Sequence, residues 1–159
     1  MNEKLYLSLE KPKPLDYLKL RKSCGFGEVT MEQSKESLSN SLFFVSILYS
    51  NKLVGFGRVV GDGTLFFYIS DVLVSPEMAG KGIGGMLMKE IVSYLQKKAN
   101  SLSTIAVIAF RDKESFYQKY GFELCPNEHF GAGLIYPLLF NQRTSIQIDK
   151  SQHTNNPMG

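Results

Sequence analysis

One glycine-rich segment constrains this chain more than any other part of its sequence. Directly after it, apolar residues recur at every fourth position, as Ile83, Leu87, Ile91 and Leu95. This spacing predicts a helix over 82–98 with one buried face. Glycine weakens the start of a helix, so several of them there need a backbone reason. The segment holds four within six residues, at Gly80, Gly82, Gly84 and Gly85.

The position of this segment in the chain predicts a site for a phosphate or pyrophosphate group. The preceding run, 65–74, is apolar on both faces, as is typical of a central strand in a covered sheet. The first turn of a helix has free N–H groups and a partial positive charge. Glycines let an anion approach that backbone closely. The alternative is a tight turn between strand and helix that binds no ligand.

Two common nucleotide motifs do not fit this segment. Gly80, Gly82 and Gly85 match the dinucleotide pattern GxGxxG, but residues 75–79 separate the strand from the first glycine. No acidic residue ends the next apolar run, 104–110, and hairpins precede the loop where a βαβ unit would be needed. A Walker A loop is excluded because no Gly-Lys-Ser/Thr is present.

The rest of the sequence predicts one mixed α/β domain over 1–140. Hydrophobic residues make up 43% and charged residues 21%, which places the chain in the globular class. Thr30 and Gln33 form a capping-box pattern, and Asp112 is expected to cap the last helix. The polar segment 141–159 is expected to be a flexible tail. Strands are expected at 4–10, 42–49, 53–60, 65–74, 104–110 and 133–140, and helices at 15–24, 30–40, 82–98 and 112–121.

The charge balance and the cysteines argue against several function classes. The net charge is +3 without any block of five basic residues, so a nucleic-acid groove is not indicated. No apolar stretch reaches the ~18 residues of a membrane span, and no secretory signal is visible. Cys24 and Cys125 lack metal-ligand spacing, so no metal site is expected. A cytoplasmic location is expected.

Two segments resemble a known family. Residues 74–84, Val-Ser-Pro-Glu-Met-Ala-Gly-Lys-Gly-Ile-Gly, resemble the coenzyme A signature of the GCN5-related N-acetyltransferases (GNAT), Gln/Arg-x-x-Gly-x-Gly/Ala after a Val-x-Pro turn. Residues 116–122, Phe-Tyr-Gln-Lys-Tyr-Gly-Phe, resemble its second signature, Phe-Tyr-x-x-x-Gly-Phe. The order of elements agrees from about residue 4 to 140. The resemblance implies a central mixed, mostly antiparallel sheet flanked by helices and splayed after its fourth strand.

The resemblance also implies a reaction, the direct transfer of an acetyl group from acetyl-CoA to a primary amine of a small molecule or peptide. Tyr117 matches the tyrosine that is often assigned as the acid for the leaving thiolate. The backbone of Val72, Leu73 and Val74 is expected to pair with the pantetheine arm. The pyrophosphate is expected to lie against Ala79, Gly80, Lys81, Gly82, Ile83, Gly84 and Gly85.

Two positions depart from the family pattern. Ala79 stands where the signature has Gln or Arg, and the resemblance implies that this position acts largely through its backbone N–H. Phe110 stands where the family often has an Asn that contacts the cofactor. These departures leave open an alternative function, a CoA-binding module without catalysis that acts as a sensor or binds a partner. A homodimer is also possible.

Two charged residues remain as further candidates. Asp71, near the end of the central strand, is a candidate catalytic base that removes the proton of the amine. It could equally be a carboxylate whose hydrogen bonds are satisfied inside the protein. Arg58 alternates with apolar residues on one strand and could bind an acidic group of the substrate.

Overall fold

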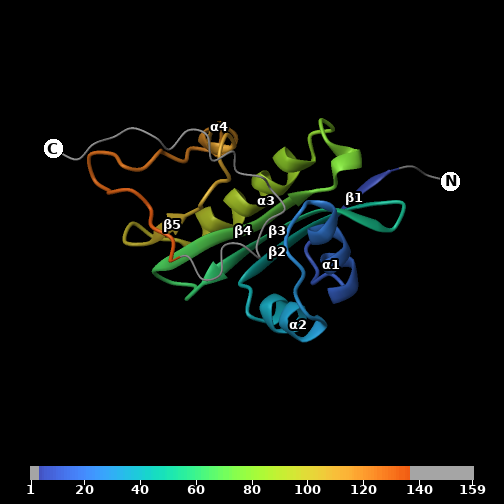
Figure 1. Cartoon of the computed structure of the whole chain (residues 1–159). Coiled ribbons are helices and arrows are strands. Elements are labelled where there is room, and N and C mark those ends of the chain that lie inside the picture. Colours follow the sequence, from blue (N-terminus) through green and yellow to red (C-terminus); the bar gives the residue numbers. More distant parts are fainter. Residues whose placement is uncertain (1–3, 137–159) are drawn as a thin grey trace, which may run out of the picture.

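A five-stranded sheet forms the centre of the computed structural model, which describes residues 4–136 (Figure 1). The strands lie in sequence order, and the first four pair antiparallel while the fifth runs parallel to the fourth. This arrangement confirms the mixed, mostly antiparallel sheet that the sequence predicts. The strands are β1 (Leu5–Ser8), β2 (Phe43–Tyr49), β3 (Lys52–Gly61), β4 (Phe66–Val74) and β5 (Thr104–Ala106).

Helices cover both faces of this sheet (Figure 1). Helices α1 (Pro14–Ser23) and α2 (Met31–Ser39) lie on one face, and α3 (Ile83–Lys98) lies on the other. The capping box at the start of α2 is confirmed, because the Thr30 hydroxyl accepts from the Gln33 N–H and the Gln33 side chain accepts from the Thr30 N–H. A short helix, α4 (Glu114–Gln118), lies beside the start of α3.

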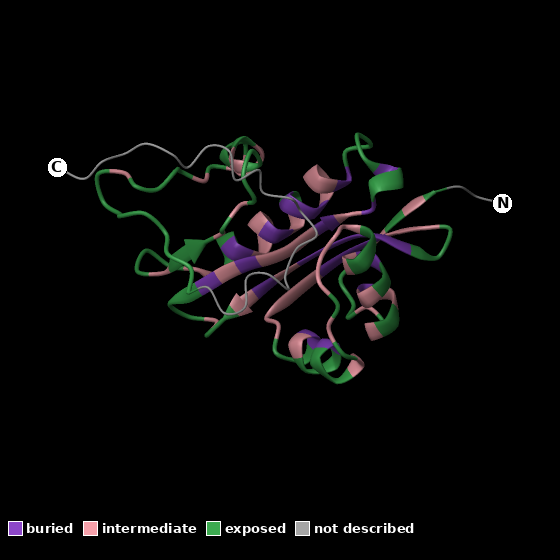
Figure 2. Cartoon of the chain, in the orientation of Figure 1, coloured by how far each residue is buried: buried purple, intermediate pink, exposed green. Residues whose placement is uncertain are grey.

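Two apolar clusters form the core, one on each face of the sheet. Figure 2 shows buried residues on the strands and on the helices that cover them. All four residues of the predicted α3 stripe are buried, and they pack on strand residues such as Phe67 and Ile69. On the opposite face Tyr17 and Leu20 of α1 pack against Phe56 of β3 and Leu73 of β4. The sheet is therefore covered on both sides, as the apolar character of β4 predicts.

Strand β4 contains one extra residue opposite β3. Ser70 pairs with Arg58 and Leu73 pairs with Phe56, so two residues of β4, Asp71 and Val72, oppose Gly57 alone. This is a β-bulge, and Asp71 within it has a φ of +53°. Because one extra residue reverses the alternation of side chains, Leu73 faces α1, whereas Ile69 before the bulge faces α3.

The sheet opens after β4. Strands β4 and β5 pair only over Phe66–Tyr68 and Thr104–Ala106, which are the beginning of β4 and the whole of β5. Residues 107–110 continue beyond β5 without joining the sheet. This confirms the splay after the fourth strand that the resemblance implies.

Several predicted boundaries were wrong in the last third of the described chain. The strand expected over 104–110 ends at Ala106, because its residues diverge from β4. Helix α4 is shorter than the predicted 112–121. Its cap position is Lys113 and not Asp112, which has a left-handed backbone conformation with a φ of +69°. Residues 133–136 form no strand, and 137–140 and the tail 141–159 lie outside the described residues. Within residues 4–136 no helix is long and apolar enough to cross a membrane.

Candidate active site

The glycine-rich loop leaves β4 through a short 3-10 turn (Pro76–Met78) and reaches α3 at Gly82. Gly80 and Gly82 have φ values of +75° and +76°, where other residues cost roughly 1–2 kcal/mol. A Cβ atom added at either position would meet nothing within 4 Å. The backbone conformation, and not close packing, therefore requires these two glycines.

The start of α3 presents free N–H groups. The first helical hydrogen bond runs from the Met86 N–H to the Gly82 carbonyl, at 3.1 Å. The N–H groups of Ile83, Gly84 and Gly85 precede it and have no partner within the helix. In the described part of the chain no side chain caps this end, and no acidic residue lies in the first turn. Backbone donors, the helix dipole and open space above Gly80 and Gly82 together suit a pyrophosphate group.

Gly84 and Gly85 have a different role, because they bring the two sequence signatures together. A Cβ atom on Gly84 would lie 3.2 Å from two ring carbons of Phe116. A Cβ atom on Gly85 would lie 3.1 Å from the Tyr120 hydroxyl. These two glycines therefore let α4 pack closely on the first turn of α3, and α4 carries Tyr117.

The other residues predicted to bind the cofactor differ in how far their side chains are buried. The side chains of Leu73 and Ile83 are buried, so these residues can reach a ligand only through their backbone. Ala79 and Lys81 are exposed. The Ala79 N–H donates to the Pro76 carbonyl at 3.2 Å, so the group expected to reach the cofactor closes the 3-10 turn in this structure. The contact of each residue with the cofactor stays a prediction.

A cavity of about 240 Å³ occupies the splay between β4 and residues 107–110. It brings the neighbouring Asp71 and Val72 together with the distant Tyr117, and all three were predicted for the site. Phe110 meets Phe26 edge-on, with ring centroids 5.4 Å apart. The lining is mostly apolar and comprises Phe26, Tyr68, Ile69, Ser70, Asp71, Val72, Val107, Ile108, Phe110, Tyr117 and Ile135.

Tyr117 projects from α4 into this cavity. Its ring is held edge-on by Phe116 and Phe122, at centroid distances of 5.1 and 6.2 Å. The contact with Phe122 confirms that the chain folds back after Gly121, whose φ is +90°. The Tyr117 hydroxyl makes no hydrogen bond to any described residue. Burial, and to a smaller extent the nearby Tyr68 hydroxyl, raise the pKa of Tyr117, so it is protonated at neutral pH.

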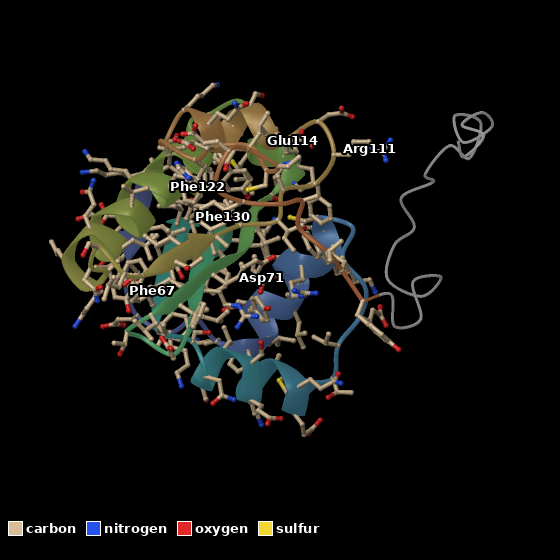
Figure 3. All side chains as sticks on the ribbon, turned by 90° about the vertical axis from the view of Figure 1, so that its left-hand side faces the viewer. Phe67, Asp71, Arg111, Glu114, Phe122 and Phe130 are labelled. Atoms are coloured by element: carbon tan, nitrogen blue, oxygen red, sulfur yellow. The ribbon has the colours of Figure 1, made fainter. Side chains whose placement is uncertain are left out.

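Asp71 points toward α1 and is enclosed by hydrogen-bond donors (Figure 3). Arg21 Nη1 donates to Oδ1 at 2.6 Å, and Arg58 Nε donates to Oδ2 at 2.8 Å. The Tyr17 hydroxyl donates to Oδ2 at 2.6 Å, and the pKa of Tyr17 is raised by burial and then by the Asp71 charge. The Asp71 side chain is only 5% exposed. Whether Asp71 takes a proton stays a prediction.

The sequence analysis missed two members of this cluster, Tyr17 and Arg21. Arg58 binds Asp71 of the same chain, where the sequence suggested an acidic group of the substrate. In the sequence, Arg21 is a basic residue near the C-terminus of a helix, and such residues are common on protein surfaces. No spacing rule connects α1 with β4, so the cluster could not be found before the fold was known.

A larger cavity, of about 450 Å³, lies between α1, the start of β3 and the turn after β4. It contains none of the residues predicted for the site. Its charged lining residues are of both signs, Asp16, Lys19, Lys52 and Glu77, and Lys52 pairs with Glu77. Because Asp71, Val72 and Tyr117 line the smaller cavity, we assign the candidate active site to that cavity.

The splayed sheet, the glycine-rich start of α3 and the tyrosine beside the opening define an acyltransferase architecture. The acetyltransferase (GNAT) domain model matches residues 22–136 of this chain. Among solved structures, a probable acetyltransferase from methicillin-resistant Staphylococcus aureus superposes with a TM-score of 0.75 at 28% identity, covering 84% of this chain and all of the other. The chain therefore belongs to the GNAT family of acetyltransferases, and it is an acyltransferase.

Relatives by sequence carry related names. The uncharacterized N-acetyltransferase ycf52 of Pyropia yezoensis is 32% identical over 123 residues, which cover 74% of this chain and 70% of that protein. Serotonin N-acetyltransferase 2, chloroplastic, of Oryza sativa subsp. japonica is 32% identical over 98 residues, which cover 62% of this chain and 46% of that protein.

Proposed function

We propose that this chain transfers the acetyl group of acetyl-CoA directly to a primary amine of a small molecule or peptide. The observation that carries the proposal is the Tyr117 hydroxyl, which has no hydrogen-bond partner within residues 4–136 and lies in an apolar cavity beside the β4 bulge. The glycine-rich start of α3, with its free N–H groups, lies at the end of the same strand. These features support the proposal because a suitable place for an anion, an opened strand edge and a candidate acid lie in neighbouring elements.

Each part of the site has a role in the proposed reaction. The loop from Ala79 to Gly85 holds the pyrophosphate, and the backbone from Val72 to Val74 pairs with the pantetheine arm. The amine nitrogen attacks the thioester carbonyl carbon, the C–S bond breaks, and Tyr117 donates its proton to the thiolate. The attacking nitrogen loses a proton to solvent water during transfer, and the phenolate of Tyr117 is reprotonated from solvent.

The walls of the cavity favour an acceptor amine with an apolar, aromatic body. Phe26, Ile108 and Phe110 line the cavity together with Tyr117. Aromatic walls bind flat apolar groups through area burial and edge-to-face contacts. The name of the rice relative, a serotonin N-acetyltransferase, agrees with this acceptor class.

Two further expectations stay predictions. A cytoplasmic location is expected from the sequence, although relatives include proteins named as chloroplastic. A homodimer is possible. Among the described residues no group of three or more His, Cys, Asp or Glu side chains could hold a metal ion.

A thiol-release assay with a panel of primary amines tests the proposal. Arylalkylamines, aliphatic polyamines, amino sugars and peptide N-termini should each be mixed with acetyl-CoA, and the products weighed by mass spectrometry. We expect free CoA to appear in equal amount to an acetylated amine, with arylalkylamines among the fastest. Binding of CoA without thiol release for any amine would contradict the proposal and favour the non-catalytic module.

A further inference from the structure

We propose that Asp71 is a positioning residue, which holds the β4 bulge and the α1 layer in place for acetyl transfer and does not itself take a proton. This inference rests on the proposed function, because it assigns a role within that same site. The sequence alone left the two roles of Asp71 open. The contacts of the carboxylate, its backbone conformation and the two faces of β4 decide between them.

The first argument is the direction of the carboxylate. Its three donors, Tyr17, Arg21 and Arg58, come from α1 and β3 and occupy both of its oxygens. The two guanidinium side chains are 17% and 12% exposed, so solvent hardly competes for these bonds. A general base must reach the proton it removes, directly or through one water. Here both oxygens already accept hydrogen bonds from side chains of α1 and β3.

The second argument is the backbone of Asp71 itself. Its φ of +53° is a left-handed conformation that aspartate and asparagine adopt more readily than most residues, although still at a cost. Such a conformation persists only where the surroundings hold it. The three hydrogen bonds to the side chain supply that restraint.

The third argument is what the bulge does to β4. Residues 67 and 69 face α3, and so do 72 and 74, whereas Leu73 packs with Tyr17 on the α1 face. Without the extra residue this alternation would be reversed after Ser70. The bulge also leaves one residue of β4 without a partner on β3, at the edge of the cavity. The conformation of Asp71 therefore sets which backbone groups from 71 to 74 face the acyl group.

The same cluster joins the helices to the strand. Tyr17 and Arg21 lie one turn apart on α1, and the Arg21 guanidinium also stacks over Phe26, which lines the cavity. Arg58 donates further bonds to the Ser37 carbonyl and the Ser41 hydroxyl at the end of α2. Asp71 is thus the point at which α1, α2, β3 and β4 are held together beside the site.

This role is tested by two substitutions of Asp71, one that removes only its charge and one that also removes its tolerance for a positive φ. Asp71→Asn keeps the tolerance for positive φ and one acceptor oxygen, whereas Asp71→Ala loses both. We expect kcat of the Asn variant to stay within about tenfold of wild type, and kcat of the Ala variant to be at least about tenfold lower again. A proton-accepting role would instead lower kcat of both variants alike, by typically 10²–10⁴-fold.

The pH profile gives a second, independent result. We expect the acidic limb of kcat/KM to be the same in wild type and in Asp71→Asn. Loss of that limb in the variant would overturn the proposal. If the Asp71 variants do not fold, Tyr17→Phe carries the test, since it removes one donor and keeps the ring. The proposal predicts a lower kcat with an unmoved acidic limb in Tyr17→Phe, and a shifted limb would contradict it.

Amide hydrogen exchange distinguishes this inference from the proposed function. We expect faster exchange across residues 70–74 in Asp71→Ala than in Asp71→Asn, whether or not any amine is acetylated. Equal protection of these amides in wild type and both variants would overturn the positioning role. Absence of acetyl transfer by wild type, with the exchange difference present, would overturn the proposed function alone.

Discussion

At the scale of single residues, Tyr117 shows how a sequence motif acquires a chemical meaning. The motif from Phe116 to Phe122 predicts a tyrosine beside the cofactor, and the structure places its hydroxyl in the cavity without a partner among the described residues. Among the described residues, only Arg21 Nε and the Ser46 hydroxyl are fully buried polar side-chain atoms without a partner, so the Tyr117 hydroxyl is open to the cavity, where a ligand can form a hydrogen bond with it. The free hydroxyl is therefore consistent with a role toward a ligand.

Tyr117→Phe removes this hydroxyl and keeps the ring that packs between Phe116 and Phe122. We expect kcat to fall at least ~10-fold while CoA affinity is nearly unchanged, because a general acid typically contributes 10²–10⁴-fold. Tyr120→Phe is the matched control, since its hydroxyl lies beside Gly85 and does not line the cavity. Wild-type turnover in Tyr117→Phe, measured with a good acceptor amine, would remove this residue from the mechanism.

The pH dependence of turnover follows from the same residue. A phenol acts as an acid only while protonated, so activity that depends on Tyr117 is lost as pH rises through its pKa. Burial raises that pKa above the ordinary value of about 10. We therefore expect any alkaline limb of kcat due to Tyr117 to lie above pH ~10 and to be absent from Tyr117→Phe. A Tyr117-dependent fall in kcat between pH 7 and 9 would contradict this assignment.

At the scale of elements, the connection from β4 to α3 was the most predictable part of the molecule. Its buried stripe and its glycines follow from local backbone rules, so the sequence predicted the start of α3 closely. The sequence predicted the role of only some of these glycines. Gly80 and Gly82 serve the backbone conformation, but Gly84 and Gly85 make room for α4, a contact between distant segments that spacing does not show.

A charge substitution at the helix start tests the anion site. Gly82→Asp and Gly82→Asn are similar in shape, and both side chains tolerate a positive φ. Because the carboxylate repels a pyrophosphate, we expect the Asp variant to bind CoA at least about tenfold more weakly than the Asn variant. Calorimetry with CoA measures both affinities. Equal affinities would place the pyrophosphate away from α3.

At the scale of the whole molecule, the order of elements and the splayed sheet were predictable because a resemblance covered most of the chain. Long-range contacts were not. The cluster of Tyr17, Arg21, Arg58 and Asp71 joins four elements, and each residue alone has an ordinary local pattern. Asp112 likewise appeared to be a helix cap, but its conformation depends on how the chain turns toward α4.

The central claim is that the cofactor lies in the splay of the sheet and not in the larger cavity beside α1. A crystal structure with CoA bound tests this claim most directly. We expect pyrophosphate oxygens at about 2.7–3.2 Å from N–H groups of the loop and the first turn of α3, with the pantetheine arm along Val72 to Val74. A pyrophosphate bound between Lys19 and Lys52 in the larger cavity, with the splay empty, would contradict it.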